Sequence, residues 1–420
     1  MKRIMSVFLI GVLVLSIFAL TGCSSNAPSP SNTNVEQAPA SSEPSGEKTK
    51  VKFAVQADST KALETIIATF NEKSEKYEVE PIIFTNDSGN MHDQIVNSLS
   101  SKSGEYDVVS MDVVWAGEFA AAGYLEPLDS FIKNFGWKPA DFNAGSMASG
   151  KYKGKLYAVP YFSDLGFLYY RKDIVSEEDA KKLASADYAL KDLLEMAEKY
   201  AGKGGTKYGY VYQSSQYEGL TCNLNEFTNN WKNVSDGLTM MKAFTDSKAT
   251  PNDILVYTEG ETHNAFLNGE SVFARNWPYM NGMAASGEYA VGTDKIGFAV
   301  LPHGGTVGGY ILGVSVNSTN MEGAKEFLAF IAGPEGQKIN ATVGNYLPGF
   351  NTLMTDEEVL KANTLLTDEA FQKALQATIA RPVVANYSEV SDAIQIKAHE
   401  FLSGNGKLED AVKVIEEKLQ

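Results

Sequence analysis

The stretch LYAVPYFSDLGFLYYR, residues 156–171, decides how the chain is organised. Its two ends are apolar and aromatic runs with the length of buried strands. Between them, Pro160 cannot donate to a sheet ladder, and Ser163, Asp164 and Gly166 are residue types that favour loops. We therefore expect a buried strand interrupted by a short loop, a segment able to leave one sheet, cross a cleft and enter another. A simple hairpin with Asp164 in its turn is the alternative at this point.

Residues 1–50 have the composition of an export signal followed by a tether. Lys2 and Arg3 precede an apolar run, residues 5–20, that is too short and wrongly flanked for a lasting membrane span. The run ends in Leu-Thr-Gly-Cys, which resembles a bacterial lipoprotein signal and predicts a signal peptide at 1–22 and lipidation of Cys23. A plain secretory signal with an incidental cysteine is the alternative. The rest of 23–50 is rich in Ser, Pro, Asn, Ala and Glu and has little to bury, so we expect a disordered stalk.

The remaining chain of about 370 residues exceeds one ordinary hydrophobic core, so we expect two domains or lobes. The formal charge of −16 becomes −18 once the two positive charges of Lys2 and Arg3 leave with the signal. This acidity argues against nucleic acid and anionic lipid as partners. With Cys23 modified, Cys222 has no disulfide partner, so stability rests on a large core. Aromatic residues make up 11% of the chain, which leaves rings for a binding surface.

After residue 50 the pattern alternates strands and helices. We expect strands at 51–55, 79–84 and 106–111, separated by amphipathic helices that include 63–70 and 91–101. This spacing predicts a parallel sheet, and ligands of such sheets bind beyond the carboxyl ends of the strands. Asp112 falls just past the third strand, with Trp115 one helical turn later; a helix N-cap is the alternative role for Asp112. Further along the pattern is mainly helical, with strands expected at 208–212, 271–275, 296–301 and 311–316.

The sequence contains no recognisable catalytic motif. There is no phosphate-binding loop and no nucleophile elbow, and the four histidines have no metal-ligand spacing. The glycines at 304–309 do not match a dinucleotide fingerprint, so we predict neither a metal nor a cofactor. Asp112, Asp164 and Glu218 could supply a carboxylate pair for glycoside cleavage, which keeps an exported glycoside hydrolase open. The pair Tyr169-Tyr170 could form part of a ferric site. The alternative is an ordinary strand in which the two rings face opposite sides.

What recurs instead is an aromatic ring next to a planar hydrogen-bonding group. A pyranose has apolar C–H faces and a rim of hydroxyls, so rings cover its faces while carboxylates, amides and guanidinium groups pair with its hydroxyls. Each charge-assisted bond of this kind contributes about 1.5–3 kcal/mol. Core packing is the alternative for any single ring, and the set carries more weight than one member. The candidates are Asp112 with Trp115, Phe162 with Asp164, Tyr217 with Glu218, Asn276 with Trp277 and Tyr279, Tyr310 after Gly309, and Arg381 with Tyr387.

Several of these residues stand in longer motifs. They are YDVVSMDVVWAGEFAAAGYLEPLD at 106–129, GKLYAVPYFSDLGFLYYRKDI at 154–174, YGYVYQSSQYEGLTCNLNEF at 208–227, NWPY at 276–279, VLPHGG…GGYILGVS at 300–315 and ARPVVANYSEVSDAIQ at 380–395. Together they resemble the extracellular solute-binding proteins of sugar ABC importers, and the trehalose/maltose-binding branch in particular. The likeness runs from about residue 51 to residue 420. It implies an α/β, two-lobed periplasmic-binding-protein fold of type II with three interlobe crossovers.

The resemblance also assigns site residues. Asp112 matches the family's sugar-binding Asp in the MDV-W motif, and Asp164 matches its binding Asp in the crossover. Trp277 and Tyr279 match its W-P-Y rings, and Arg381 matches its late binding Arg.

Three departures leave the identity of the sugar open. Phe162 stands where the branch often has Tyr, which removes a hydroxyl contact. Tyr310 stands where it often has Trp, which gives a smaller platform. Residues 86–93 lack the arginine expected near the start of the second helix.

We therefore expect a monomeric binding protein and not an enzyme. The resemblance implies a lobe at 51–159 and 301–344, a second lobe at 160–300 and 345–420, and closure about hinges near 159–160, 300–301 and 344–348. The protein would sit outside the cytoplasmic membrane, anchored through Cys23, and pass a maltose- or trehalose-type di- or oligosaccharide to a permease. A glycoside hydrolase, a binder of xylo- or manno-oligosaccharides, and a binder of a polyamine or iron complex are the alternatives.

Overall fold

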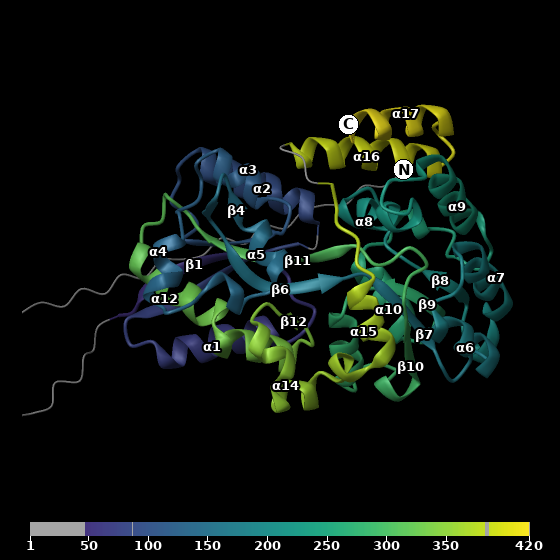
Figure 1. Cartoon of the computed structure of the whole chain (residues 1–420), viewed down its shortest axis with the longest axis horizontal. Coiled ribbons are helices and arrows are strands. Elements are labelled where there is room, and N and C mark those ends of the chain that lie inside the picture. The colour runs from purple at the N-terminus through teal and green to yellow at the C-terminus, as the bar shows by residue number, and fades with distance from the viewer. Residues whose placement is uncertain (1–46, 86, 383–385, 420) are drawn as a thin grey trace, which may run out of the picture. The chain divides into compact units, whose positions relative to one another are not determined.

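The computed structural model describes residues 47–419 apart from Asn86 and residues 383–385 (Figure 1). From Lys48 onward these residues belong to one compact unit. The predicted signal peptide, the predicted lipidation at Cys23 and nearly all of the predicted stalk lie outside the described residues. The first strand begins at Thr49, two residues before the start expected at residue 51.

A sheet of six strands forms the centre of the first lobe. The order of its strands is β12 (Leu347–Pro348), β6 (Val159–Leu165), β11 (Val307–Val314), β3 (Val108–Asp112), β1 (Thr49–Gln56) and β2 (Tyr77–Phe84). Strand β1 pairs in parallel with β2 and β3, which confirms the predicted parallel arrangement. Strand β11 runs antiparallel between β3 and β6, because it returns late in the chain from the second lobe.

Helices cover this sheet and close the core of the first lobe. They are α1 (Ala62–Lys73), α2 (Ser88–Ser100), α3 (Ala116–Ala121), α4 (Asp129–Asn134), α5 (Ala144–Ser149), α12 (Met321–Ala332), α13 (Pro334–Val343) and α14 (Glu357–Ala362), with a small hairpin of β4 (Lys151–Tyr152) and β5 (Lys155–Leu156). Phe327 of α12 is fully buried, with its ring centroid 5.1 Å from those of both Phe53 and Phe70. Helix α2 begins earlier than expected, because Asp87 accepts a hydrogen bond from the Asn90 N–H at 3.0 Å and caps it.

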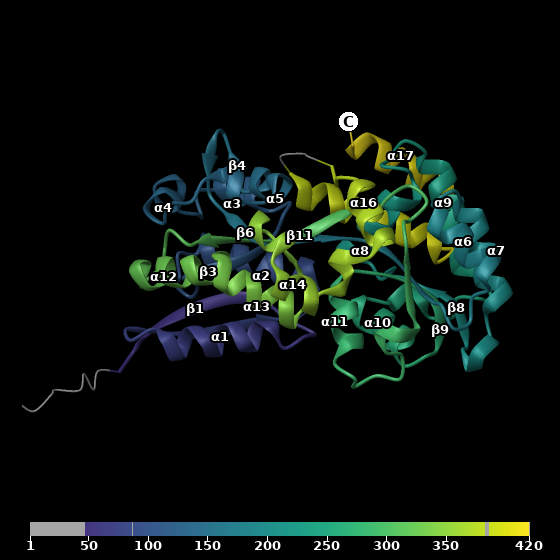
Figure 2. The same cartoon turned by 60° about the horizontal axis from the view of Figure 1, so that its bottom comes forward.

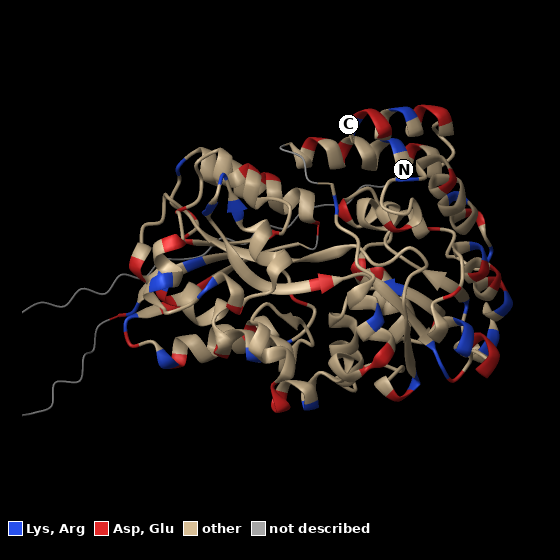
Figure 3. Ribbon diagram, viewed as in Figure 1, with Lys and Arg blue, Asp and Glu red and all other residues tan. Residues whose placement is uncertain are grey.

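The second lobe has a sheet of four strands. Their order is β10 (Ile296–Ala299), β7 (Phe167–Arg171), β9 (Ser271–Asn276) and β8 (Tyr208–Val211). The helices of this half are α6 (Glu177–Ser185), α7 (Leu190–Tyr200), α8 (Glu218–Phe227), α9 (Val234–Asp246), α10 (Glu259–Leu267), α11 (Tyr279–Ala285), α15 (Glu369–Gln376), α16 (Tyr387–Leu402) and α17 (Leu408–Lys418). Figure 3 shows that the strands are mostly uncharged, while acidic and basic residues concentrate on the helices and loops.

The 156–171 segment joins the two sheets. Strands β6 and β7 are separated only by Gly166 and belong to different sheets, so the predicted crossing is confirmed and the hairpin alternative is wrong. The expected loop is also wrong, because Pro160, Ser163 and Asp164 all take part in the ladder of β6. Pro160 is tolerated there because the pairing with β11 shifts register between Tyr310 and Ile311, opposite to it.

The chain passes between the lobes three times. It leaves the first sheet at Gly166, returns between β10 and β11, and leaves again after β12, which pairs with β6. In Figures 1 and 2, β6 and β11 run side by side through the middle of the molecule. The lobe boundaries expected at 159/160 and 344/345 therefore fall too early, since β6 and β12 both belong to the first sheet. Among the described helices, none combines the length and apolarity needed to cross a membrane.

Candidate functional site

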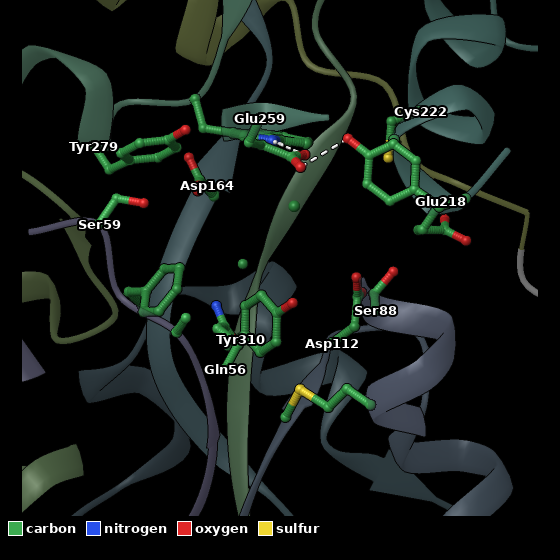
Figure 4. A pocket seen from close by; sticks show the side chains of 18 of the residues that line it. Gln56, Ser59, Ser88, Asp112, Asp164, Glu218, Cys222, Glu259, Tyr279 and Tyr310 are labelled. Carbon is green, nitrogen blue, oxygen red and sulfur yellow. Dashed lines mark hydrogen bonds between the residues drawn. The ribbon is translucent and has the colours of Figure 1, made fainter. Parts of the chain in front are cut away.

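A cavity lies at the carboxyl ends of β1, β2 and β3, facing α8, α10 and the turn after β9 (Figure 4). Its volume is about 820 Å³, including space open to solvent. Ten of the twelve residues that the sequence singles out for ligand binding line it: Asp112, Phe162, Asp164, Tyr217, Glu218, Trp277, Tyr279, Gly309, Tyr310 and Arg381. Residues more than 260 positions apart in the sequence therefore face one space.

Trp115 and Asn276 do not line this cavity. Trp115 is buried at the start of α3, where it packs against the rings of His92 and Phe119. Asn276 is fully buried; its Oδ1 accepts the N–H of Trp277 at 2.9 Å, and its Nδ2 contacts Met280 Sδ at 3.4 Å. Asn276 therefore holds the backbone of Trp277, which lines the cavity, whereas Trp115 packs in an apolar cluster; neither is itself a lining residue, which corrects their assignment as ligand contacts.

Arg381 joins carboxylates from both lobes. Its Nη1 donates to Asp112 Oδ2 and to Glu218 Oε1, both at 2.9 Å, and its Nη2 donates to Asp112 Oδ1. Asp112 is the last residue of β3, not the first residue past it, and its Oδ1 also accepts the Val114 N–H at 3.2 Å. Glu218 opens α8 and further accepts from the hydroxyls of Tyr387 and Ser391. One guanidinium therefore connects the first sheet to the second lobe.

Burial shapes the charges of this cluster. Burial raises the pKa of Glu218, although the charge of Arg381 opposes the rise. Burial alone would lower the pKa of Arg381, but Asp112 and its other anionic neighbours raise it well above its ordinary value. The Nε of Arg381 is buried and has no hydrogen-bond partner among the described residues.

Glu259 holds two rings at the second-lobe wall. Trp277 Nε1 donates to Glu259 Oε1 at 3.1 Å, and the Tyr217 hydroxyl donates to Glu259 Oε2 at 2.7 Å (Figure 4). Tyr279 is held in a similar way, because its hydroxyl lies 2.9 Å from His263 Nδ1. Burial lowers the pKa of His263 to about 4, so this histidine is neutral at physiological pH. The three rings are therefore fixed before any ligand arrives.

Asp164 has the least satisfied carboxylate in the site. It projects from β6 toward the cavity, and it accepts one hydrogen bond, at 2.9 Å, from the neighbouring Leu165 N–H. Burial raises its pKa well above the ordinary value, and the charge of Arg275 offsets only part of that rise. Its free lone pairs face the space where a hydroxyl donor fits.

The sequence alone missed several residues of the wall. Gln56, the last residue of β1, lines the cavity, as do Ser59, Thr85 and Ser88, which follow β1 and β2. The rule that placed Asp112 at the carboxyl end of β3 would have found them. Glu259 and Tyr346 carry no comparable signal, because their place in the wall depends on how later segments fold back onto the site.

The described part of the wall is acidic. It carries the carboxylates of Asp112, Asp164, Glu218 and Glu259 and the single guanidinium of Arg381. No group of three or more His, Cys, Asp or Glu side chains among the described residues is arranged to hold a metal ion. The site therefore combines aromatic faces with hydrogen-bond acceptors, which suits a ligand rich in hydroxyl groups.

Comparison with known proteins gives matches over most of the chain. Residues 65–392 match the family model described as bacterial extracellular solute-binding protein. A probable ABC transporter-binding protein of Deinococcus radiodurans is 30% identical over 348 residues, 76% of this chain and 81% of that protein. A maltotriose-binding protein of Pyrococcus abyssi is 32% identical over 103 residues, 24% of this chain and 20% of that protein.

Solved structures show the same fold. Maltose-bound MalE3 of T. maritima superposes with a TM-score of 0.79 at 30% identity, covering 88% of this chain and 99% of that chain. The GacH receptor of Streptomyces glaucescens, solved unliganded and with acarbose, has a TM-score of 0.73 at 20% identity and covers 89% of this chain and 99% of that one. The likeness to GacH supports the two-lobed fold alone. The chain belongs to the family of bacterial extracellular solute-binding proteins.

Proposed function

We propose that this protein captures a di- or short oligosaccharide of the maltose or trehalose type between its lobes and delivers it to an ABC permease. The observation that carries the proposal is the cavity itself, which gathers aromatic rings and hydrogen-bonding groups from both lobes. Its volume of about 820 Å³ lies within the range of small-molecule sites, about 300–1,000 Å³. The maltose-bound relative of T. maritima supports an α-glucoside as the ligand.

Each part of the wall has a role in this proposal. Trp277, Tyr279 and Tyr310 cover the apolar faces of the sugar rings. Asp164 accepts hydrogen bonds from sugar hydroxyls, because its carboxylate has only one hydrogen bond within the protein. An uncharged ligand suits the acidic wall, because an anionic sugar would meet four carboxylates and one guanidinium.

Closure of the lobes supplies the mechanism. The sugar favours the closed form because only there do residues of both lobes touch it. Of the hinges proposed from the sequence, those near 300–301 and 344–348 lie beside the second and third crossovers, and the one near 159–160 lies at the start of β6. Because β6 stays paired with β11 as far as Leu165, we place the first hinge at Gly166 instead.

The protein acts by binding and not by chemistry. Two carboxylates that glycoside cleavage would need, Asp112 and Glu218, are both engaged by Arg381. We also propose that the mature chain is a monomer that begins at a lipidated Cys23, which holds it at the outer face of the membrane near its permease.

A thermal-shift screen of residues 24–420 against neutral di- and trisaccharides tests the proposal, because a ligand that binds only the folded form raises the melting temperature. We expect a maltose- or trehalose-type sugar to raise it, with saturable binding in calorimetry and no cleavage of the sugar. A sugar uronate or phosphate should give a smaller shift than its neutral counterpart. If no sugar raises the melting temperature, or if the sugar is hydrolysed, the proposed function is wrong.

A further inference from the structure

A buried arginine lies against the ring that we assign to the sugar. Arg275 is in β9, two residues before Trp277, and it is fully buried. The carbon at the centre of its guanidinium lies 4.0 Å from the centroid of the Trp277 ring. The quadrupole of an indole ring attracts a desolvated cation at this distance, and the fixed cation restrains the ring in return.

The guanidinium is itself fixed on its remaining sides. Its Nε donates to both oxygens of Glu226, at 3.2 and 3.0 Å, and its Nη2 donates to Glu226 Oε1. Its Nη1 donates to Gln213 Oε1 at 3.2 Å, and Gln213 Nε2 donates back to the Arg275 carbonyl oxygen at 3.1 Å. Gln213 and Glu226 are buried as well. The orientation of the guanidinium is therefore set by the interior of the second lobe.

The same ion pair supports two of the interlobe crossovers. Glu226 Oε1 accepts the N–H of Thr306 at 2.9 Å, just before β11. The Thr306 carbonyl oxygen in turn accepts the N–H of Gly166 at 3.0 Å, between β6 and β7. A Cβ atom at Gly166 would lie 2.2 Å from Arg275 Nη2 and 2.4 Å from Glu226 Oε1. The first crossover thus passes directly over the ion pair, with no room for a side chain.

We propose that the Arg275–Glu226 pair is a positioning unit, which holds the Trp277 ring in the orientation that receives the sugar and ties that ring to the crossovers about which the lobes close. This inference rests on the proposed sugar-binding function. A buried ion pair contributes little to stability compared with apolar residues of the same volume, so stability alone gives no reason for one at this place.

Arg275→Lys is the test variant, because it keeps the charge and loses the planar contact with the ring. Arg171→Lys is the matched control. Arg171 lies on the neighbouring strand β7, is 7% exposed, and makes a two-point pair with Asp173, with both bonds at 2.7 Å. Neither Arg171 nor Asp173 lines the cavity.

Sugar affinities measured in a double-mutant cycle show whether Arg275 acts by positioning Trp277 or by supporting the fold in general. Arg275→Lys should weaken binding about tenfold, the order of a desolvated cation–π contact, and Arg171→Lys should not. In a Trp277→Phe background the effect of Arg275→Lys should largely disappear, whereas in a Tyr310→Phe background it should persist in full. An equal loss in both backgrounds would show that Arg275 does not act through Trp277.

A measurement on the protein without sugar tests the contact between Arg275 and Trp277 independently of whether the protein binds a sugar. With 5-fluorotryptophan in the protein, the ¹⁹F resonance that disappears in Trp277→Phe belongs to Trp277. Arg275→Lys should shift or broaden this resonance and leave those of the other tryptophans in place, while Arg171→Lys should change none. An unchanged Trp277 resonance overturns the inference. If Arg275→Lys does not fold, Glu226→Gln, which keeps the shape of the pair and removes its negative charge, takes its place in both experiments.

Discussion

At the scale of single residues, the site is made of groups whose partners are only partly supplied by the protein. Asp164 has one hydrogen bond, and Arg381 keeps one donor free, while Glu259 is already used to hold two rings. Groups whose hydrogen bonds are made within the protein hold the wall in shape, and the Asp164 carboxylate stays open to a ligand. This division gives each side chain a different expected response to substitution.

The raised pKa of Asp164 predicts that the affinity for sugar depends on pH. Burial raises its pKa well above the ordinary value, so part of the free protein carries a neutral carboxyl group as the pH falls toward that pKa. A carboxylate accepts sugar hydroxyls better than the neutral acid does, so affinity should increase as the pH rises through the raised pKa and then level off. Calorimetry across this range checks the sign.

Asp164→Asn serves as the control for this profile, because it has no proton to lose. It should bind with an affinity that the pH no longer changes, and above the pKa it should bind more weakly than the wild type by about 1.5 kcal/mol or more. An affinity that falls with rising pH in the wild type would contradict the role given to Asp164.

Two tryptophans should respond in opposite ways. Trp277→Ala removes the ring that faces the cavity and should cost about 2 kcal/mol or more of binding free energy, with a small effect on the melting temperature. Trp115→Phe changes a residue that packs on His92 and Phe119 and should lower the melting temperature without changing affinity. Calorimetry measures the sugar affinity of both variants, and thermal unfolding measures their melting temperatures. Loss of affinity in Trp115→Phe would return that residue to the site.

Sequence reasoning named ten residues that line the cavity, and it misjudged residues whose direction depends on the local backbone. Asp112 and Arg381 were identifiable because a strand end and a long-range motif marked them. Trp115 belongs to the same motif as Asp112, but the turn between β3 and α3 points it into the apolar cluster under α2. Glu259 was missed because only the folded chain brings its helix terminus beside Trp277.

At the scale of elements, the decisive feature is how β6 becomes β7. The sequence indicated two strands and a crossing, and it failed on the loop, because loop-forming residue types at 160–164 were outweighed by pairing with β11 and β12. The parallel arrangement of β1, β2 and β3 followed from helical and extended periodicity alone. The antiparallel return of β11 did not, because pairing between distant strands leaves no local pattern.

A contact between α16 and the pair α2–α3 predicts pH-dependent stability. Ser388 of α16 donates to Glu118 Oε2 at 2.8 Å and lies 3.2 Å from His92 Nε2. Burial alone would lower the pKa of His92, but hydrogen bonds and charge from Glu118 and Asp93 raise it above its ordinary value. Asp392, also on α16, adds an acid that interacts with His92.

A histidine whose pKa is raised on folding stabilises the folded state below its unfolded pKa of about 6.5, and this stabilisation is lost as the pH rises through the folded pKa. The melting temperature of the wild type should therefore fall as the pH is raised from about 6 through the pKa of His92. Subtracting the profile of His92→Gln isolates this contribution from other groups, such as the neutral His263. A difference between the two proteins that is constant across the range would rule out titration of His92 as its source.

At the scale of the whole molecule, polar contacts join the two lobes around the cavity. Arg381 makes one of these contacts, because it bonds to Asp112 in the first sheet and to Glu218 in the second lobe. Its removal leaves two buried carboxylates without a cation, and such unpaired charges cost about 3–5 kcal/mol. The conformational equilibrium of the lobes should be sensitive to this one side chain.

We predict that sugar lowers the radius of gyration of the wild type in small-angle X-ray scattering, and that Arg381→Met abolishes this decrease. The variant should have a larger radius of gyration with and without sugar, because repulsion between Asp112 and Glu218 favours separated lobes. Lys61→Met, which removes an exposed interlobe ion pair with Glu288 of 3.7 Å, is the control and should compact like the wild type. A variant at Arg381 that compacts normally would show that closure does not depend on this bridge.

Cys222 gives the protein a natural reporter. The thiol lies in α8 at the cavity wall, is 2% exposed, and burial raises its pKa, so it is unreactive while the lobes stay together. A chain that starts at Ser24 contains no other cysteine. The rate at which a maleimide dye labels such a chain therefore reports how often Cys222 becomes exposed to solvent. A bound solute that keeps the lobes together should lower this labelling rate.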